Sequence, residues 1–298
     1  MKKIFILLAI LVLASCEEMG KDGRLKQKVD WSEWYYDDVV ADDGKPRIMI
    51  MSFNVRYKNS TTDIGEFNWD NRKKGCYAMI NTLRPIVMGV QECTGTQRDD
   101  LINNCPGYEA KGKGRKDNYS DEQCAIFYLK DSVSLEDYGN FWLTETPDKV
   151  SKHPEAEHYR IATWIKFKHK KTGNVFYHLN THLDLTTVRD FEMRVIMDQV
   201  EKKFGDYPAV LTADWNTSDD DPIFTDMYNT FVNARATANT GDAYGTFNGF
   251  TSPNKTTRID HIFYRGFSGC TKFMTVKQSW EGYAYISDHY PVYAILKF

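Results

Sequence analysis

Short apolar runs that alternate with helix-like segments dominate the chain from Arg47 onwards. Runs of this kind, bounded by turn residues, predict β-strands at 48–55, 86–90, 125–129, 163–167, 175–180, 209–212, 259–264, 273–276 and 290–296. Helices are predicted at 69–83, around Leu101 and at 187–204. Since hairpins are mixed with long helical crossovers, we expect mixed sheets with helices outside, in one α/β domain.

The segment 187–204 repeats apolar residues at helical spacing. Val188, Phe191, Val195 and Val200 recur at intervals that place them on one side of a helix. We therefore expect these four side chains to form the buried face of that helix.

Polar residues stand in or directly beside the apolar runs. They are Asn54, Glu92, His182, Asp214, Asp260 and His289. Each has a structural explanation when taken singly: Glu92 as a helix cap, Asp214 as a turn residue, His182 as a hydrogen-bonded core histidine. A buried polar group is costly unless it is paired or binds a ligand. Because the pattern recurs throughout one chain, it favours a shared functional site.

The motifs around these residues resemble one known family. The ordered series runs through Ser52-Phe53-Asn54-Val55-Arg56-Tyr57, Gln91-Glu92, Asn180-Thr181-His182-Leu183-Asp184, Asp214-Trp215-Asn216, Ile259-Asp260-His261-Ile262 and Ser287-Asp288-His289. It is similar to the endonuclease/exonuclease/phosphatase superfamily, which includes deoxyribonuclease I. The resemblance implies a four-layer α/β sandwich of two packed mixed sheets, with the site at one end. The sequence departs from the usual family pattern at Ala213, Trp215 and Leu185. The central residues of the motifs are retained.

The resemblance also implies a chemistry and a role for each residue. It implies metal-dependent hydrolysis of a phosphodiester or phosphomonoester, with Mg²⁺ as the cofactor and Mn²⁺ as a substitute. The implied metal ligands are Glu92, Asn54 and Asp288, and carboxylate oxygens suit this ion. The implied catalytic residues are Asp214, which activates water, and Asn216, which contacts the phosphate or a second metal. His289, whose ring Asp260 holds, would contact the scissile phosphate, and His182 would bind another phosphate oxygen. Arg160 is an expected phosphate contact, with a surface salt bridge as the alternative.

The start of the chain predicts export. Lys2 and Lys3 precede an apolar run that is shorter than the roughly 20 residues of a membrane span, as in a secretory signal. The run ends in Leu13-Ala14-Ser15-Cys16, which resembles a bacterial lipobox. The expected division is a lipoprotein signal peptide at 1–16 ending at a lipidated Cys16, a tether at 17–45 and the hydrolase domain at 46–298. We expect a lipoprotein in the periplasm or anchored at the outer membrane or cell surface, with an ordinary cleaved signal as the alternative.

Net charge bears on the expected binding partners, and the number of cysteines bears on the state of their thiols. The net charge of −3 disfavours a protein that coats nucleic acid, for which a basic face supplies most of the affinity. A secreted nuclease remains the second hypothesis, and an inactive binding module is the third. The cysteines other than Cys16 are odd in number and show no zinc spacing, so buried free thiols are expected. The phosphate-ester substrate and the membrane are the expected partners of a monomer.

Overall fold

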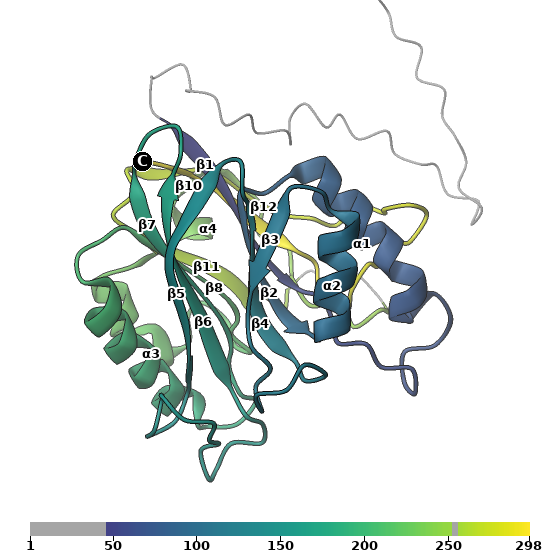
Figure 1. Ribbon diagram of the computed structural model, residues 1–298, viewed down its shortest axis with the longest axis horizontal. Helices are drawn as coiled ribbons and strands as arrows, with labels where there is room; N and C mark the ends of the chain where they lie inside the picture. The colour runs from purple at the N-terminus through teal and green to yellow at the C-terminus, as the bar shows by residue number, and fades with distance from the viewer. Residues whose placement is uncertain (1–45, 252–255) are drawn as a thin grey trace, which may run out of the picture. The chain divides into compact units, whose positions relative to one another are not determined.

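Two mixed β-sheets pack face to face in the computed structural model, which describes residues 46–251 and 256–298 (Figure 1). The predicted signal peptide (1–16) and tether (17–45) lie outside the described residues. The seven-stranded sheet has the order β10 (Ala238–Gly241), β12 (Gly269–Thr275), β13 (Val292–Lys297), β1 (Arg47–Asn54), β2 (Val87–Cys93), β4 (Gln123–Leu129), β3 (Tyr108–Lys111). The six-stranded sheet has the order β5 (Val133–Trp142), β6 (Ile161–His169), β7 (Val175–His182), β8 (Ala209–Asp214), β11 (Asp260–Arg265), β9 (Val232–Asn233).

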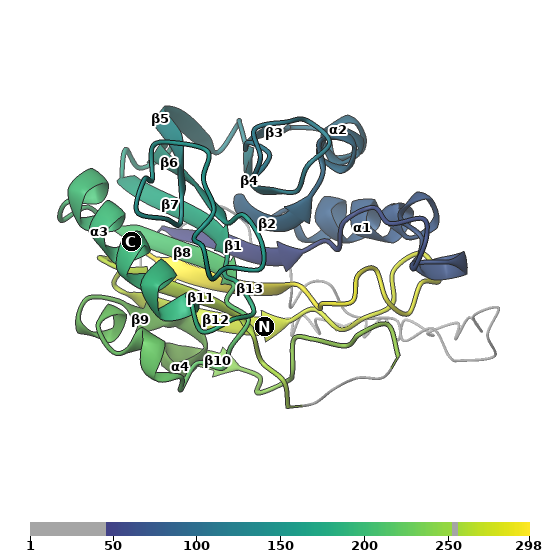
Figure 2. The same ribbon diagram turned by 90° about the horizontal axis from the view of Figure 1, so that it is seen from below.

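Helices form the outer layers. The α-helices are α1 (Trp69–Leu83), α2 (Gly95–Asn104), α3 (Arg189–Phe204) and α4 (Ala234–Thr237), with short 3-10 turns η2 (Gly65–Phe67), η3 (Pro222–Phe224) and η4 (Met227–Asn229). Viewed from below, α3 and α1 lie on opposite sides of the pair of sheets (Figure 2). The arrangement confirms the predicted four-layer sandwich. None of the helices in the described part of the chain has the length and apolar character that crossing a membrane requires.

The fold contains the same crossover twice. β1 and β2 are parallel and joined through α1, and β7 and β8 are parallel and joined through α3. Parallel neighbours end at the same edge of a sheet, and ligands in α/β folds bind beside the carboxyl ends of such strands. Each crossover therefore delivers two strand ends, and the residues that follow them, to one edge.

An apolar core and a polar network lie between the sheets. The core packs side chains of both sheets together, including Ile48, Ile126, Phe167, Phe176, Val210, Ile262 and Val292. Nearer the site, Gln91 Nε2 donates to Asn180 Oδ1 at 2.6 Å, and Thr212 Oγ1 donates to the same oxygen at 3.0 Å. Gly89 faces this network, and a Cβ there would lie 2.0 Å from Thr212 Oγ1. The two crossovers thus meet at a point where only glycine fits.

The buried face of α3 differs in part from the prediction. Met193, Ile196, Val200 and Phe204 pack against the six-stranded sheet, whereas Phe191 and Val195 are half-buried. Phe191 instead contacts the His153 ring, with centroids 4.7 Å apart, so a long loop and not the sheet covers it. The prediction was wrong here because helical spacing alone does not say which of two adjacent apolar stripes faces the sheet.

The structure contains several strands that the sequence did not predict. β5 lies at the edge of its sheet and its middle is exposed, so it lacks the apolar run that predicted the other strands. The short strands β3, β9 and β10 also went unpredicted.

The cysteines of the described chain are all buried and free, as expected from their number and spacing: Cys76, Cys93, Cys105, Cys124 and Cys270.

Candidate active site

The predicted polar residues converge at one end of the sandwich. They lie at the ends of five strands and in the loops beside them: Asn54 on β1, Glu92 on β2, His182 on β7, Asp214 on β8, Asp260 on β11, and Asn216, Asp288 and His289 in loops. Asp214 stands opposite His182 on one neighbouring strand and opposite Asp260 on the other. The pairing register of three adjacent strands therefore brings these side chains together.

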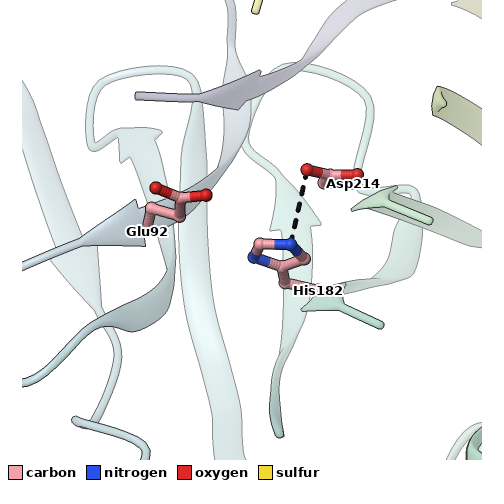
Figure 3. Close-up of side chains that lie close together, drawn as sticks. All are labelled: Glu92, His182 and Asp214. Carbon is pink, nitrogen blue, oxygen red and sulfur yellow. Dashed lines mark ion pairs between the residues drawn. The ribbon is translucent and has the colours of Figure 1, made fainter. Parts of the chain in front are cut away.

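Asp214 is the centre of the cluster and is almost fully buried, with 1% of its surface exposed. Its Oδ2 accepts a hydrogen bond from Asn54 Nδ2 at 2.9 Å and lies 3.4 Å from His182 Nε2 and 3.6 Å from His289 Nε2. Figure 3 shows the close contact between Asp214 and His182, with Glu92 nearby. Burial raises the pKa of Asp214, although His289 opposes the shift. A carboxylate with a raised pKa is suited to accept a proton near neutral pH.

His289 and Asp260 form a buried pair. His289 Nδ1 lies 2.9 Å from Asp260 Oδ2, which leaves Nε2 on the side of Asp214. Burial alone would lower the pKa of His289, but the carboxylates of Asp260 and Asp214 overcome this effect and raise the pKa well above its usual value. The raised pKa favours the charged form of the ring, which suits a negatively charged partner.

His182 behaves in the opposite way. Burial lowers the pKa of His182 well below its usual value, and the charges of Arg160 and His289 add to the shift. Its Nε2 lies 3.0 Å from Asn216 Nδ2, and Asn216 Nδ2 also donates to the Leu183 carbonyl at 2.8 Å. A neutral ring accepts the amide hydrogen at Nε2 and carries its own hydrogen on Nδ1.

Glu92 and Asn216 hold uncommon backbone conformations. Their φ angles are 57° and 53°, in the left-handed region that non-glycine residues rarely occupy. Glu92 lies at a register shift between β2 and β4, and its carboxylate accepts hydrogen bonds from Asn54 Nδ2 and the Tyr57 amide, both at 3.1 Å. Such conformations concentrate at functional sites, where surrounding contacts stabilise them.

Asp288 and Arg160 lie at the margin of the cluster. The carboxylate of Asp288 accepts from Ser287 Oγ at 3.2 Å and lies 3.5 Å from Arg56 Nη1. Arg160 is buried, and its Nε lies 3.5 Å from Asp184 Oδ2, so the ion pair is internal and not a surface salt bridge. Asp184 in turn accepts from the backbone amides of Glu157 and His158 at 3.2 and 2.9 Å.

Arg72 positions the loops at the site and was not identified from the sequence. Its guanidinium is fully buried and donates to the carbonyls of Phe67, Val55, Arg56 and Ile286 at 2.7 to 2.9 Å. These bonds fix the chain after β1 and the approach to Ser287. A signal was present, because an arginine on the apolar face of α1 is costly to bury unless it has such partners.

The donor set fits a divalent cation. Ligand atoms of Glu92, His182 and Asp214 lie within 4.8 Å of one another, as do those of Asp214, Asp260 and His289. Several carboxylates meet here, and oxygen-rich sets of this kind suit Mg²⁺ and Mn²⁺. The two groups share Asp214 and together form a cluster of acidic residues and histidines able to hold a metal ion.

Comparison with known proteins agrees with the fold. The model of the endonuclease/exonuclease/phosphatase family matches residues 51–289, and the chain therefore belongs to this family. Its structure is similar to an endonuclease/exonuclease/phosphatase from Bacteroides vulgatus, with 30% identity, a TM-score of 0.78, and 85% of this chain and 99% of that chain covered. A mannosyl-6-phosphatase from Bacteroides thetaiotaomicron VPI-5482 has 29% identity and a TM-score of 0.78, with 84% of this chain and 100% of that chain covered.

More distant structures share the fold alone. One is D. rerio TDP2 complexed with a single-strand DNA product, at 16% identity and a TM-score of 0.66, with 85% of this chain and 99% of that chain covered. No curated protein matches the chain. The chain is thus a hydrolase of a family of metal-using phosphoesterases and nucleases, with a cluster of acidic residues and histidines able to hold a metal.

Proposed function

We propose that the chain is a magnesium-dependent hydrolase of phosphate esters, with Mn²⁺ as a substitute ion. The observation that carries the proposal is the buried carboxylate of Asp214 between a cationic His289 and a neutral His182. Phosphoester hydrolysis needs a base for water, a cationic group for the phosphate and hydrogen-bond donors for its oxygens. The cluster offers all three.

Each residue then has a task. Glu92, with Asn54 and with Asp288 directly or through water, would hold the cation, which supplies charge neutralisation on the phosphate when bound. Asp214 accepts the proton of the attacking water. The backbone N–H of Asn216 donates to Asp214 Oδ1 at 3.0 Å and fixes the orientation of this carboxylate.

The two histidines contact the phosphate in different protonation states. His289 donates from Nε2 as an imidazolium, held in orientation by Asp260 at Nδ1. His182 donates as a neutral imidazole, since Asn216 is bonded at its Nε2 and the Nδ1 hydrogen remains for a phosphate oxygen. The phosphate would thus lie between a charged donor, His289, and a neutral donor, His182.

The test is a hydrolysis screen with controlled metal content. Plasmid DNA, RNA, phospholipids, sphingomyelin, sugar phosphates and chromogenic phosphoesters are incubated with the full domain, with magnesium, manganese or a chelator. We expect turnover of a phosphate ester that a chelator abolishes and magnesium restores. Full activity in chelator would refute the metal requirement, and inactivity on every ester would favour a binding module.

A secreted nuclease is the second candidate. The fold shared with TDP2 in complex with a DNA product supports it, whereas the net charge of −3 disfavours it. The similarity to a mannosyl-6-phosphatase supports a smaller phosphate ester. Hydrolysis of plasmid DNA in preference to small esters in the same screen would reverse this order.

Export and a lipid anchor complete the proposal. The lipobox-like Leu13-Ala14-Ser15-Cys16 supports a lipoprotein that acts outside the cytoplasm. A stable membrane association of a soluble domain needs attached lipid. Cys16→Ala should therefore move the protein from the membrane fraction to the soluble fraction, and unchanged partitioning would refute the anchor.

A further inference from the structure

The chain directly after β8 contributes to the site although it lies beyond the sheet. Backbone pairing of β8 with its neighbours stops at Asp214 and Trp215, whose amide donates to the Ile259 carbonyl at 2.8 Å. The next residue, Asn216, has a left-handed φ of 53°. Carbonyls that lie beyond a strand need other partners when they are partly buried. Side chains of two different elements supply those partners.

Arg189 and His261 hold two consecutive carbonyls. Arg189, in the first turn of α3, donates from Nη1 to the Asn216 carbonyl at 2.8 Å. His261, on β11, donates from Nε2 to the Thr217 carbonyl at 3.0 Å. Burial lowers the pKa of His261, which favours the neutral ring, and the carbonyl fixes the ring hydrogen on Nε2. A helix and a strand thus share the task of holding this short loop.

The bond from Arg189 is the stronger of the two. A guanidinium is always charged, and hydrogen bonds with a charged donor are about twice as strong as neutral ones. Arg189 is half-buried, and the Asn216 carbonyl is the one acceptor of its guanidinium among the described residues. Arg194 differs, because it is exposed on the same helix and pairs with Asp190. The first turn of α3 therefore directs a charged donor to the loop behind the site.

Asn216 connects this backbone to the reacting groups. Its backbone N–H donates to Asp214 Oδ1 at 3.0 Å. Its Nδ2 lies 3.0 Å from His182 Nε2 and donates to the Leu183 carbonyl at 2.8 Å. Both hydrogens of the side-chain amide are thus used inside the site. A rotation of the chain at Asn216 would release Asp214 and His182 together.

We propose that Arg189 and His261, here called the carbonyl clamp, are positioning residues that set the geometry of the site through Asn216. The kinetic part of this inference rests on the proposed function. By holding the carbonyls of Asn216 and Thr217, the clamp keeps the loop in the orientation that serves both the base and the neutral histidine. A misplacement of about 1 Å can lower a rate by about 10²-fold, so the clamp affects turnover without contacting the substrate.

The first test is a double-mutant cycle on the turnover of a small phosphate ester. Arg189→Met should lower kcat by about 10- to 100-fold and leave KM nearly unchanged, because the base and His182 are misplaced. Asn216→Gly keeps the left-handed backbone but lacks the amide, and in this background Arg189→Met should cost less than about 3-fold. Arg189→Lys keeps a charged donor and should recover part of the loss. Arg194→Met, the matched control, should keep the wild-type kcat.

His261→Phe tests the second carbonyl. Phenylalanine keeps a buried ring but has no N–H, so the Thr217 carbonyl loses its donor. We expect kcat to fall by about 3- to 10-fold with KM nearly unchanged, a smaller loss than for Arg189→Met because the histidine is a neutral donor. Full kcat in either Arg189→Met or His261→Phe would overturn the clamp.

Nitrogen-15 NMR of histidine-labelled protein supplies a readout that needs no turnover. The Nε2 signal of His182, identified by its absence in His182→Ala, reports the contact with Asn216. In Arg189→Met and in Asn216→Gly this signal should move towards the position of a nitrogen without a hydrogen bond. In Arg194→Met it should stay in place.

The same signal separates positioning from a purely structural role. If Arg189 only stabilised the fold, Arg189→Met would lower the temperature of unfolding and leave both the His182 signal and the kcat of the folded protein at their wild-type values. That result would overturn the proposal. If the wild type hydrolyses no ester, the proposed function fails, and the His182 signal alone decides whether the carbonyl clamp positions the site.

Discussion

The two crossovers β1–α1–β2 and β7–α3–β8 have the same connection but deliver different chemistry. The first ends in Asn54 and Glu92, and the second ends in His182 and Asp214. Glu92 is half-buried, and amide donors contact both of its carboxylate oxygens, whereas Asp214 is 1% exposed and lies between two histidines. One topology thus places a carboxylate at the rim and another in the interior. Asp214 is the deeper of the two, and burial disfavours its charged form.

A third region breaks the symmetry of the two crossovers. β11 supplies Asp260, and the loop before β13 supplies His289, which lies against the second crossover at Asp214. The second crossover therefore has a charged partner, and Asn54 Nδ2 links the first crossover to it through Asp214 Oδ2 at 2.9 Å.

Replacing the interior carboxylate should have the largest effect. Asp214→Asn removes the only group in the proposed mechanism that accepts a proton from water, so kcat should fall by about 10³- to 10⁴-fold. The measurement is steady-state hydrolysis of a small phosphate ester at saturating magnesium. Asp226→Asn, on an exposed 3-10 turn, is the matched control and should retain full activity. A loss below tenfold would remove Asp214 from its role as base.

The rim carboxylate should respond mainly to metal concentration. Glu92→Gln removes a charge that attracts the cation, and the magnesium concentration for half-maximal activity should rise by about 100-fold or more, since outer partners of metal ligands alone account for about 10- to 100-fold. A magnesium titration of activity measures this. Glu201→Gln, exposed on α3, serves as the control. If magnesium at any concentration failed to recover activity in Glu92→Gln, the two carboxylates would not have separate roles.

The third region should set the alkaline limit of activity. Because His289 has a raised pKa, it keeps its proton through neutral pH, and activity that needs the charged ring falls as pH rises through that pKa. Asp260→Asn removes the largest charge that raises this pKa, so the decline should begin at lower pH, with a loss of about 10- to 100-fold at alkaline pH. pH–rate profiles measure the shift.

A double-mutant cycle tests whether Asp260 and His289 act as one unit. In that case Asp260→Asn combined with His289→Ala should be little slower than His289→Ala alone. Effects that multiply independently, in variants shown to be folded, would mean that Asp260 supports the strand and not the ring.

The neutral histidine should matter less than the charged one. His182→Ala removes a neutral hydrogen-bond donor, and kcat should fall by about 5- to 10-fold, compared with a larger loss for His289→Ala. Its pH profile should keep the alkaline limb of the wild type, because the limb belongs to His289. An equal loss in both variants would contradict the assignment of different protonation states.

The contact between the crossovers should affect stability more than chemistry. In Gly89→Ala the added Cβ meets Thr212 and Asn180, so the free energy of unfolding should drop by about 1 to 3 kcal/mol from overpacking. Denaturant unfolding measures the change. Gly241→Ala adds a Cβ whose nearest neighbour is 3.4 Å away and should have a smaller effect. If Gly89→Ala and the wild type had equal free energies of unfolding, the two sheets could move apart at this point without cost.

The strand and helix pattern was predictable where burial is continuous. Helix α1 matches its predicted bounds of 69–83, and the buried strands were found within a few residues of their ends. The edge strand β5 was missed, because a half-exposed strand has no continuous apolar run. The face of α3 was predicted only in part, because Met193, Ile196 and Phe204 are buried on it while Phe191 is half-buried. These errors share one cause: exposure of a face depends on what packs against it.

The ordered motifs were enough to name the family by resemblance. The candidate site residues could be selected because carboxylates, amides and histidines at apolar strand ends are costly without partners. Tertiary structure alone decided their relations. The register of β7, β8 and β11 placed Asp214 between His182 and Asp260, and burial then separated the pKa values of the two histidines. Distances and desolvation arise only when distant segments pack together, so the protonation state of each residue is a property of the folded chain.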